Sequence, residues 1–309
     1  MKTPLICAAA SVFMCGSLLF QPLAAIEPLA SRIAHTDPAK YRQSASVHRG
    51  AGSLDYMGLL DFHALDTNLY FLHRGIIQPK SGIGHHFHNT CEEMFVVLDG
   101  EAQFTIDGRT SVLKGPAGAP VRMGHSHAIY NATDKPVQWM NINISAVKGE
   151  YDALDLDDKR DDVALDKIPV FITMSLDRGL LREGSALHGG KGTAQYRRAL
   201  GPAVFSTPWS FVDHIVIPPG ASIGAHSYRG VAQFYYVMNG EGTISTMTRG
   251  QQDSAPIRSG DAVPIQLSEV HSVENSGSQP LELMVVGVAR DLRKELNFVD
   301  GAGGPPGRR

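Results

Sequence analysis

The sequence predicts an all-β protein built from two tandem domains of the jelly-roll type. Short apolar runs with β-branched and aromatic residues alternate with turn residues along most of the chain, and helical periodicity is almost absent. The chain also repeats itself, because residues 76–101 and 216–241 align without a gap at a constant offset of 140. With 309 residues, 43% of them apolar, it has enough material for two cores.

The expected strands are bounded by Gly, Pro, Asn or Asp, the residues that favour turns. They lie at residues 68–72, 94–98, 102–106 and 137–144 in the first copy and at 210–217, 234–238 and 281–288 in the second. The repeat extends beyond these strands. Residues 48–52 match 188–192 at the same offset, and residues 127–131 match 271–275 after a four-residue insertion. Each copy is therefore a unit of about 100 residues.

Residues 1–25 have the layout of a secretory signal peptide. Lys2 supplies a positive start, residues 5–20 an apolar stretch, and Ala25 a small residue at a plausible cleavage position. A buried or membrane-spanning helix is the alternative, but the stretch is shorter than the ~20 residues that a span needs. We expect a periplasmic or secreted protein without a membrane anchor once the signal is removed.

The rest of the chain is expected to contain a first barrel at 26–147, a linker at 148–185, a second barrel at 186–290 and a flexible tail at 291–309. Within the linker, residues 169–174 are a candidate strand that pairs with a neighbouring domain. A formal net charge of -3 gives no basic excess, which argues against a nucleic-acid partner. A small molecule is the expected partner, and a homo-oligomer is compatible with the sequence.

Four side chains of the first copy form a candidate metal site. His86 and His88 are two residues apart, so in a strand both imidazoles project from the same face. Glu93 begins the next expected strand and His127 follows later, so three imidazoles and one carboxylate can converge inside a barrel. Glu92 is the competing carboxylate. His85 is expected on the opposite face of its strand, whereas His125 would share the face of His127 in a regular strand, with a place in the preceding turn as the alternative.

The spacings His86-x-His88-x4-Glu93-x6-Gly100 and Gly124-x2-His127-x3-Asn131 resemble the two motifs of the cupin superfamily. The resemblance implies two tandem double-stranded β-helix barrels, a bicupin, with the four matching residues as ligands of a divalent metal. Fe(II) and Mn(II) are favoured, and Ni, Cu and Zn are compatible. The sequence departs from the motifs at Arg122, where a proline is usual, and at Lys80, where a glycine is usual.

The second copy retains only part of this pattern. His226 and His271 persist, but Tyr228 replaces the second histidine and Gln233 replaces the carboxylate. A weak, degenerate metal site at His226, Gln233 and His271 is one interpretation. We favour a filled barrel that supports its partner, because a phenol and an amide are poor substitutes for an imidazole and a carboxylate.

The resemblance implies a metal-dependent enzyme that acts on a small oxygenated molecule. A dioxygenase-type oxidoreductase is the first expectation, because four protein ligands leave two positions open on an octahedral ion. An isomerase or lyase, with Glu93 as a catalytic proton carrier, is the enzymatic alternative. A non-catalytic periplasmic metal- or sugar-binding bicupin is the other class. Oxalate degradation is less favoured, because the His-x-His segment lacks aromatic and arginine neighbours.

Overall fold

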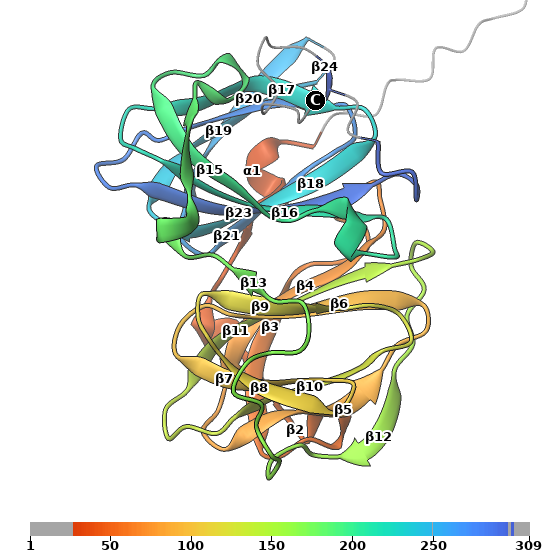
Figure 1. Ribbon diagram of the computed structural model, residues 1–309. Helices are drawn as coiled ribbons and strands as arrows, with labels where there is room; N and C mark the ends of the chain where they lie inside the picture. Colours follow the sequence, from red (N-terminus) through yellow and green to blue (C-terminus); the bar gives the residue numbers. More distant parts are fainter. Residues whose placement is uncertain (1–26, 249, 296–297, 300–309) are drawn as a thin grey trace, which may run out of the picture.

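The computed structural model describes residues 27–248, 250–295 and 298–299. Each half of the chain forms an antiparallel β-barrel of one seven-stranded and one five-stranded sheet, and the two barrels stack on each other (Figure 1). The predicted all-β tandem architecture is therefore confirmed. The signal peptide expected at 1–25 and the end of the expected tail lie outside the described residues.

The first barrel combines the sheets β13-β9-β6-β11-β4-β3-β2 and β12-β5-β10-β7-β8. Its strands are β2 Arg42–Ala45, β3 Ser53–Leu60, β4 Leu69–Ile77, β5 Ser81–Phe87, β6 Cys91–Val97, β7 Glu101–Ile106, β8 Arg109–Lys114, β9 Ala117–Val121, β10 Ser126–Asn131, β11 Val137–Ser145, β12 Leu154–Asp158 and β13 Met174–Ser175.

The second barrel combines β1-β21-β18-β23-β16-β15-β14 and β20-β19-β22-β17-β24. Its elements are the short helix α1 Leu29–Arg32, β1 Ala34–His35, β14 Arg182–Ser185, β15 Thr193–Leu200, β16 Trp209–Ile217, β17 Ser222–Tyr228, β18 Val231–Asn239, β19 Glu241–Thr248, β20 Gln251–Arg258, β21 Asp261–Ile265, β22 Val270–Glu274, β23 Leu281–Ala289 and β24 Phe298–Val299. No helix in the described part of the chain is long and apolar enough to cross a membrane.

Three apolar cores hold the barrels together. Each barrel has an interior core, and a third core lies between the seven-stranded sheets. Strand β6 shows how the alternation of side chains divides them: Phe95 and Val97 pack inside the first barrel, whereas Met94 and Val96 belong to the core between the barrels. Strand β6 of the seven-stranded sheet is therefore buried on both faces.

The barrels exchange short strands, which corrects the predicted boundaries. Strand β1 pairs with β21, and Leu29 is fully buried in the core of the second barrel, so residues 29–35 belong with that barrel and not with the first. In Figure 1, α1 lies with the C-terminal barrel and not with the N-terminal one. In the expected linker, β12 pairs with β5 and β13 with β9, both in the first barrel. Such short strands cover sheet edges, and the two-residue strands β1 and β13 are too short to produce a periodic pattern in the sequence.

The second barrel also begins and ends differently from the prediction. Strand β14 starts at Arg182, inside the expected linker, and pairs with β15. Strand β24, from the expected tail, pairs with β17.

Candidate metal centre

His86, His88, Glu93 and His127 converge inside the first barrel. His86 lies on β5 and His127 faces it on β10, while Glu93 projects inward from β6 like Phe95. The Nε2 atoms of His86, His88 and His127 lie 3.8, 3.6 and 3.4 Å from Oε2 of Glu93. All four side chains are at most 3% exposed. The structure thus brings together all four residues that the sequence analysis selected.

Backbone carbonyl oxygens hold two of the three histidines with their Nε2 atoms toward Glu93. His86 Nδ1 lies 2.8 Å from the carbonyl oxygen of Gly84, and His88 Nδ1 contacts the carbonyl oxygen of Asp152. No hydrogen-bond partner is present for the Nε2 atoms of the three histidines. Three unpartnered imidazole nitrogens around one carboxylate oxygen fit the mixed ligand set of a divalent transition metal.

Burial and the neighbouring side chains shift the pKa values of the candidate ligands. Burial raises the pKa of Glu93, but the neighbouring imidazoles of His86 and His88 outweigh it and hold this pKa well below its usual range. Burial lowers the pKa of His88, but the nearby Cys91 and Glu93 raise it to about 11. The pKa of His127 is held well below its usual value, chiefly by burial.

The neighbouring candidates point elsewhere. Glu92 projects from the opposite face of β6 and accepts hydrogen bonds from Ser206 and Thr207 of the second barrel, so it joins the barrels. His85 lies 2.9 Å from the Ser126 hydroxyl, and His125 pairs with an aspartate at the surface. The alternation expected for a strand thus separates Glu93 from Glu92.

Residues outside the two motifs complete the surroundings. The ring of His48 stacks on His86, with centroids 3.8 Å apart, and its Nδ1 lies 2.7 Å from Oδ1 of Asp155. Tyr151 and Asp152 come from the segment that was predicted to be a solvated linker. The repeat of residues 48–52 at 188–192 was a signal for His48, whereas nothing in the sequence pointed to Tyr151 or Asp155.

A chamber of about 90 Å³ adjoins Glu93. Its wall includes His48, Tyr56, Phe71, His73, Trp139, Asn141 and Tyr151, and none of its lining residues is Lys or Arg. Trp139 Nε1 and Asn141 Oδ1 are buried without a hydrogen-bond partner. Two residues that line the chamber therefore each carry a buried polar atom without a hydrogen-bond partner.

Comparison with known proteins identifies the family. The cupin domain model matches residues 73–143 and 213–287, one match in each barrel. An oxalate-binding protein of Thermotoga maritima is 30% identical over 102 residues, which cover 33% of this chain and 81% of that protein. The chain belongs to the cupin superfamily. It is a bicupin, since each half carries one cupin domain.

Solved bicupins share this architecture. Oxalate decarboxylase from Bacillus subtilis, determined at pH 4.6, matches with a TM-score of 0.60 at 14% identity, over 86% of this chain and 78% of that one. The formate complex of the Lactobacillus farciminis oxalate decarboxylase matches with a TM-score of 0.62 at 12% identity, over 86% and 88%. At these identities the likeness shows the fold alone.

The second barrel of the bicupin uses the corresponding positions differently. Nε2 of His271 lies 2.6 Å from Nε2 of Gln233 and 2.9 Å from the Tyr235 hydroxyl. Its Nδ1 faces the carbonyl oxygen of Glu269 at 3.1 Å, and burial lowers its pKa to about 4, so Nε2 acts as the acceptor. His226 lies under the stacked ring of His188. Within the described ranges, every group of three or more potential ligands lies in the first barrel.

Proposed function

We propose that this bicupin is a metal-dependent enzyme whose first barrel binds one divalent transition metal through His86, His88, Glu93 and His127. The observation that carries the proposal is the set of three unpartnered Nε2 atoms around one buried carboxylate oxygen. Fe(II) and Mn(II) are favoured, and Mn(II) centres are named for the Bacillus subtilis oxalate decarboxylase. The bound ion would supply Lewis acidity or dioxygen activation at its open positions.

The size and chemistry of the chamber favour a small oxygen-donor substrate. Its volume of about 90 Å³ is that of about three water molecules. Because no Lys or Arg lines it, the negative charge of a carboxylate substrate would be balanced by the metal. Trp139 Nε1 can donate to such a ligand and Asn141 Oδ1 can accept from it. The name of the Thermotoga maritima relative makes oxalate the first molecule to test.

The arrangement around Glu93 favours oxidation over an isomerase or lyase reaction. Asn143 donates a hydrogen bond to its Oε1, at 3.2 Å, and its Oε2 faces the three imidazoles. With both oxygens engaged, Glu93 is better suited to hold a metal than to carry protons. We therefore keep a dioxygenase-type oxidoreductase as the leading reaction.

Metal analysis of matched variants tests the proposal. The purified protein, expressed with Fe and Mn supplied, should contain about one transition metal per chain. His86→Ala and His127→Ala should lose most of it, whereas His226→Ala, the same change at the equivalent position of the second barrel, should retain it. Absence of metal from the wild type would overturn the proposal. Two equivalents would show that the second barrel also binds metal.

A non-catalytic binding role is the second candidate, favoured by the name of the oxalate-binding relative. An enzyme would convert the bound molecule, whereas a binding protein would only hold it. Calorimetry with oxalate measures binding, and an oxygen electrode together with carbon dioxide detection measures reaction on the same metal-loaded sample. Saturable binding without consumption of oxalate or of small diketones would favour the binding role.

We also propose that residues 1–25 direct export to the periplasm or outside the cell. The proposed partner of the mature protein is a small molecule, not a nucleic acid or a membrane. The sequence of residues 1–25 supports export. Determination of the N-terminal residue of the protein recovered from a periplasmic extract tests it, and Ile26 is the expected result. Recovery of an uncleaved chain from the cytoplasm would contradict it.

A further inference from the structure

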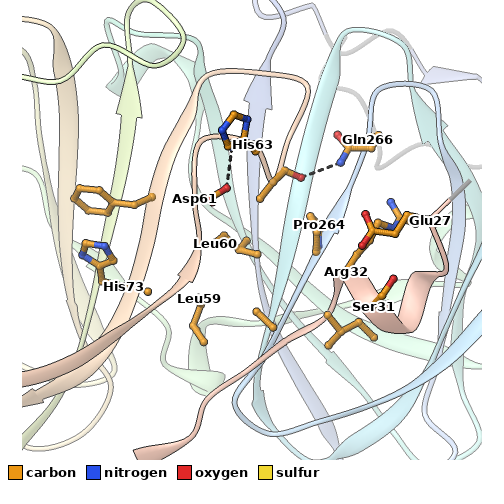
Figure 2. Close-up of a pocket in the computed structure, with 15 residues that line it drawn as sticks. Glu27, Ser31, Arg32, Leu59, Leu60, Asp61, His63, His73, Pro264 and Gln266 are labelled. Carbon is orange, nitrogen blue, oxygen red and sulfur yellow. Dashed lines mark hydrogen bonds between the residues drawn. The ribbon is translucent and has the colours of Figure 1, made fainter. Parts of the chain in front are cut away.

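Two cavities of the first barrel share the same pair of side chains. Phe71 and His73 project from β4 and line both the chamber of about 90 Å³ and a groove of about 690 Å³ between the barrels. Their rings stack with centroids 4.0 Å apart and an interplanar angle of 6°. In Figure 2, His73 lies at one end of this groove and Arg32 at the other. These two rings thus stand where the chamber and the groove meet.

The groove has the size and lining of a ligand site. Leu59, Leu60 and Pro264 contribute apolar surface, and Gln266 of the second barrel donates a hydrogen bond across it to the carbonyl oxygen of Ala64, at 2.8 Å (Figure 2). Its volume is within the range of roughly 300–1,000 Å³ that is typical of small-molecule pockets, whereas the chamber is far below that range.

The side of His73 next to β3 is thinly covered. Gly58 of β3 is the register partner of His73. A methyl group built on Gly58 would have only one neighbouring atom within 4 Å, Cδ2 of His73 at 3.7 Å. The glycine thus leaves space beside the imidazole. Burial lowers the pKa of His73 to about 4, so the two rings form an uncharged wall at neutral pH.

We propose that Phe71 and His73 determine the size of the substrate. They close the metal chamber to molecules of more than a few heavy atoms, and the groove behind them would accept the apolar extension of a longer ligand if the wall were cut back. This inference rests on the proposed metal-dependent function. It adds a specificity determinant that lies on β4, outside both sequence motifs.

Two ligands with the same dicarboxylate head and different lengths test the proposal. Mn(II)-loaded protein is titrated by calorimetry with malonate and with benzylmalonate. The wild type should bind malonate and discriminate against benzylmalonate. Phe71→Ala should improve the affinity for benzylmalonate at least ~10-fold and change that for malonate less than ~3-fold. Adding Gly58→Leu to Phe71→Ala should remove the gain, because the new side chain would fill the groove side.

Controls separate this inference from the proposed function. Phe62→Ala is the matched control, because Phe62 is exposed and lines neither cavity. If Phe71→Ala does not fold, Phe71→Leu takes its place and should show a smaller gain in affinity for benzylmalonate. The inference is wrong if the proteins bind Mn(II) but the ratio of the benzylmalonate affinity to the malonate affinity is the same in the wild type and in both Phe71 variants. It is also wrong if the Mn(II)-loaded wild type binds the two ligands equally well or binds neither. Absence of Mn(II) binding, seen before any ligand is added, would instead reject the proposed function and this inference with it.

Discussion

Adjacent glutamates on β6 should respond differently when each carboxylate is replaced by an amide. Glu92 faces the second barrel, where its oxygens accept hydrogen bonds from the Ser206 amide at 2.7 Å and hydroxyl at 2.8 Å, and from the Thr207 amide at 2.9 Å and hydroxyl at 2.5 Å. Glu93 faces the three imidazoles. We expect Glu92→Gln to weaken the joint between the barrels and to leave the metal site intact.

The expected loss of stability in Glu92→Gln follows from the hydrogen-bond donors that lose an acceptor. In Glu92→Gln one carboxylate oxygen becomes an NH2 group, so one backbone N–H of the second barrel is left buried and unpaired. The remaining bonds also lose their charge assistance. An orphaned donor costs about 1–3 kcal/mol, so the total loss in the free energy of unfolding should be about 2–4 kcal/mol. Glu93→Gln, by contrast, removes the only anionic ligand, and its metal affinity should fall at least ~100-fold.

Urea unfolding of the metal-free proteins, followed by circular dichroism, measures the first effect, and metal content after dialysis against a chelating buffer measures the second. Glu92→Gln should keep the metal content of the wild type. The reasoning is wrong if Glu92→Gln loses metal as completely as Glu93→Gln. It is also wrong if its free energy of unfolding stays within about 0.5 kcal/mol of the wild type.

Three further predictions concern the exchanged segment, the tight backbone contacts and the acid response. Leu29→Ala should destabilise the protein by about 2–4 kcal/mol in urea, since Leu29 is fully buried in the second barrel, while Leu180→Ala, at an exposed position, should have little effect. Gly84→Ala and Gly224→Ala should each destabilise their barrel, because the new methyl carbon would lie 2.1 Å from a backbone carbonyl oxygen. Only Gly84→Ala, in the first barrel, should also lower the metal content. Equal metal loss in both variants would contradict this prediction. His271 binds a proton below pH 6.5 in the unfolded chain, but only near pH 4 in the folded protein, where its pKa is lowered to about 4. Its contribution to the free energy of unfolding is therefore present above pH 6.5 and is lost as the pH falls toward 4. The loss is at most about 1.4 kcal/mol per pH unit. An acid unfolding curve of His271→Gln should be flatter in that window, and a curve parallel to that of the wild type would refute the assignment.

The candidate metal site was predictable because its signal is local. Spacing two residues apart places His86 and His88 on one face of a strand, and the distance to Gly100 distinguishes Glu93 from Glu92. The repeat then supplied an internal comparison, in which Gln233 and Tyr228 mark the copy that departs from the pattern. None of this requires knowledge of contacts between distant segments.

Other parts of the site depend on such contacts. Asp155 reaches His48 from an acidic and polar segment that was predicted to be a linker. Phe71 and His73 belong to an expected strand region, yet nothing in their spacing shows that a chamber and a groove meet there. The exchange of β1 escaped prediction for the same reason, since a two-residue strand has no measurable period, whereas β13 begins at the last residue of the strand expected at 169–174.

By itself, the sequence determined the all-β class, the duplication, the family resemblance and the four residues that meet at the candidate metal centre, because alternation and motif spacing are properties of neighbouring residues. Tertiary structure decided that Glu92 joins the barrels while Glu93 faces the histidines, that His271 is engaged by Gln233 and Tyr235, and that two rings on β4 separate a small chamber from a large groove. Those features depend on contacts between segments that are far apart in the chain, and only the folded structure brings such segments together.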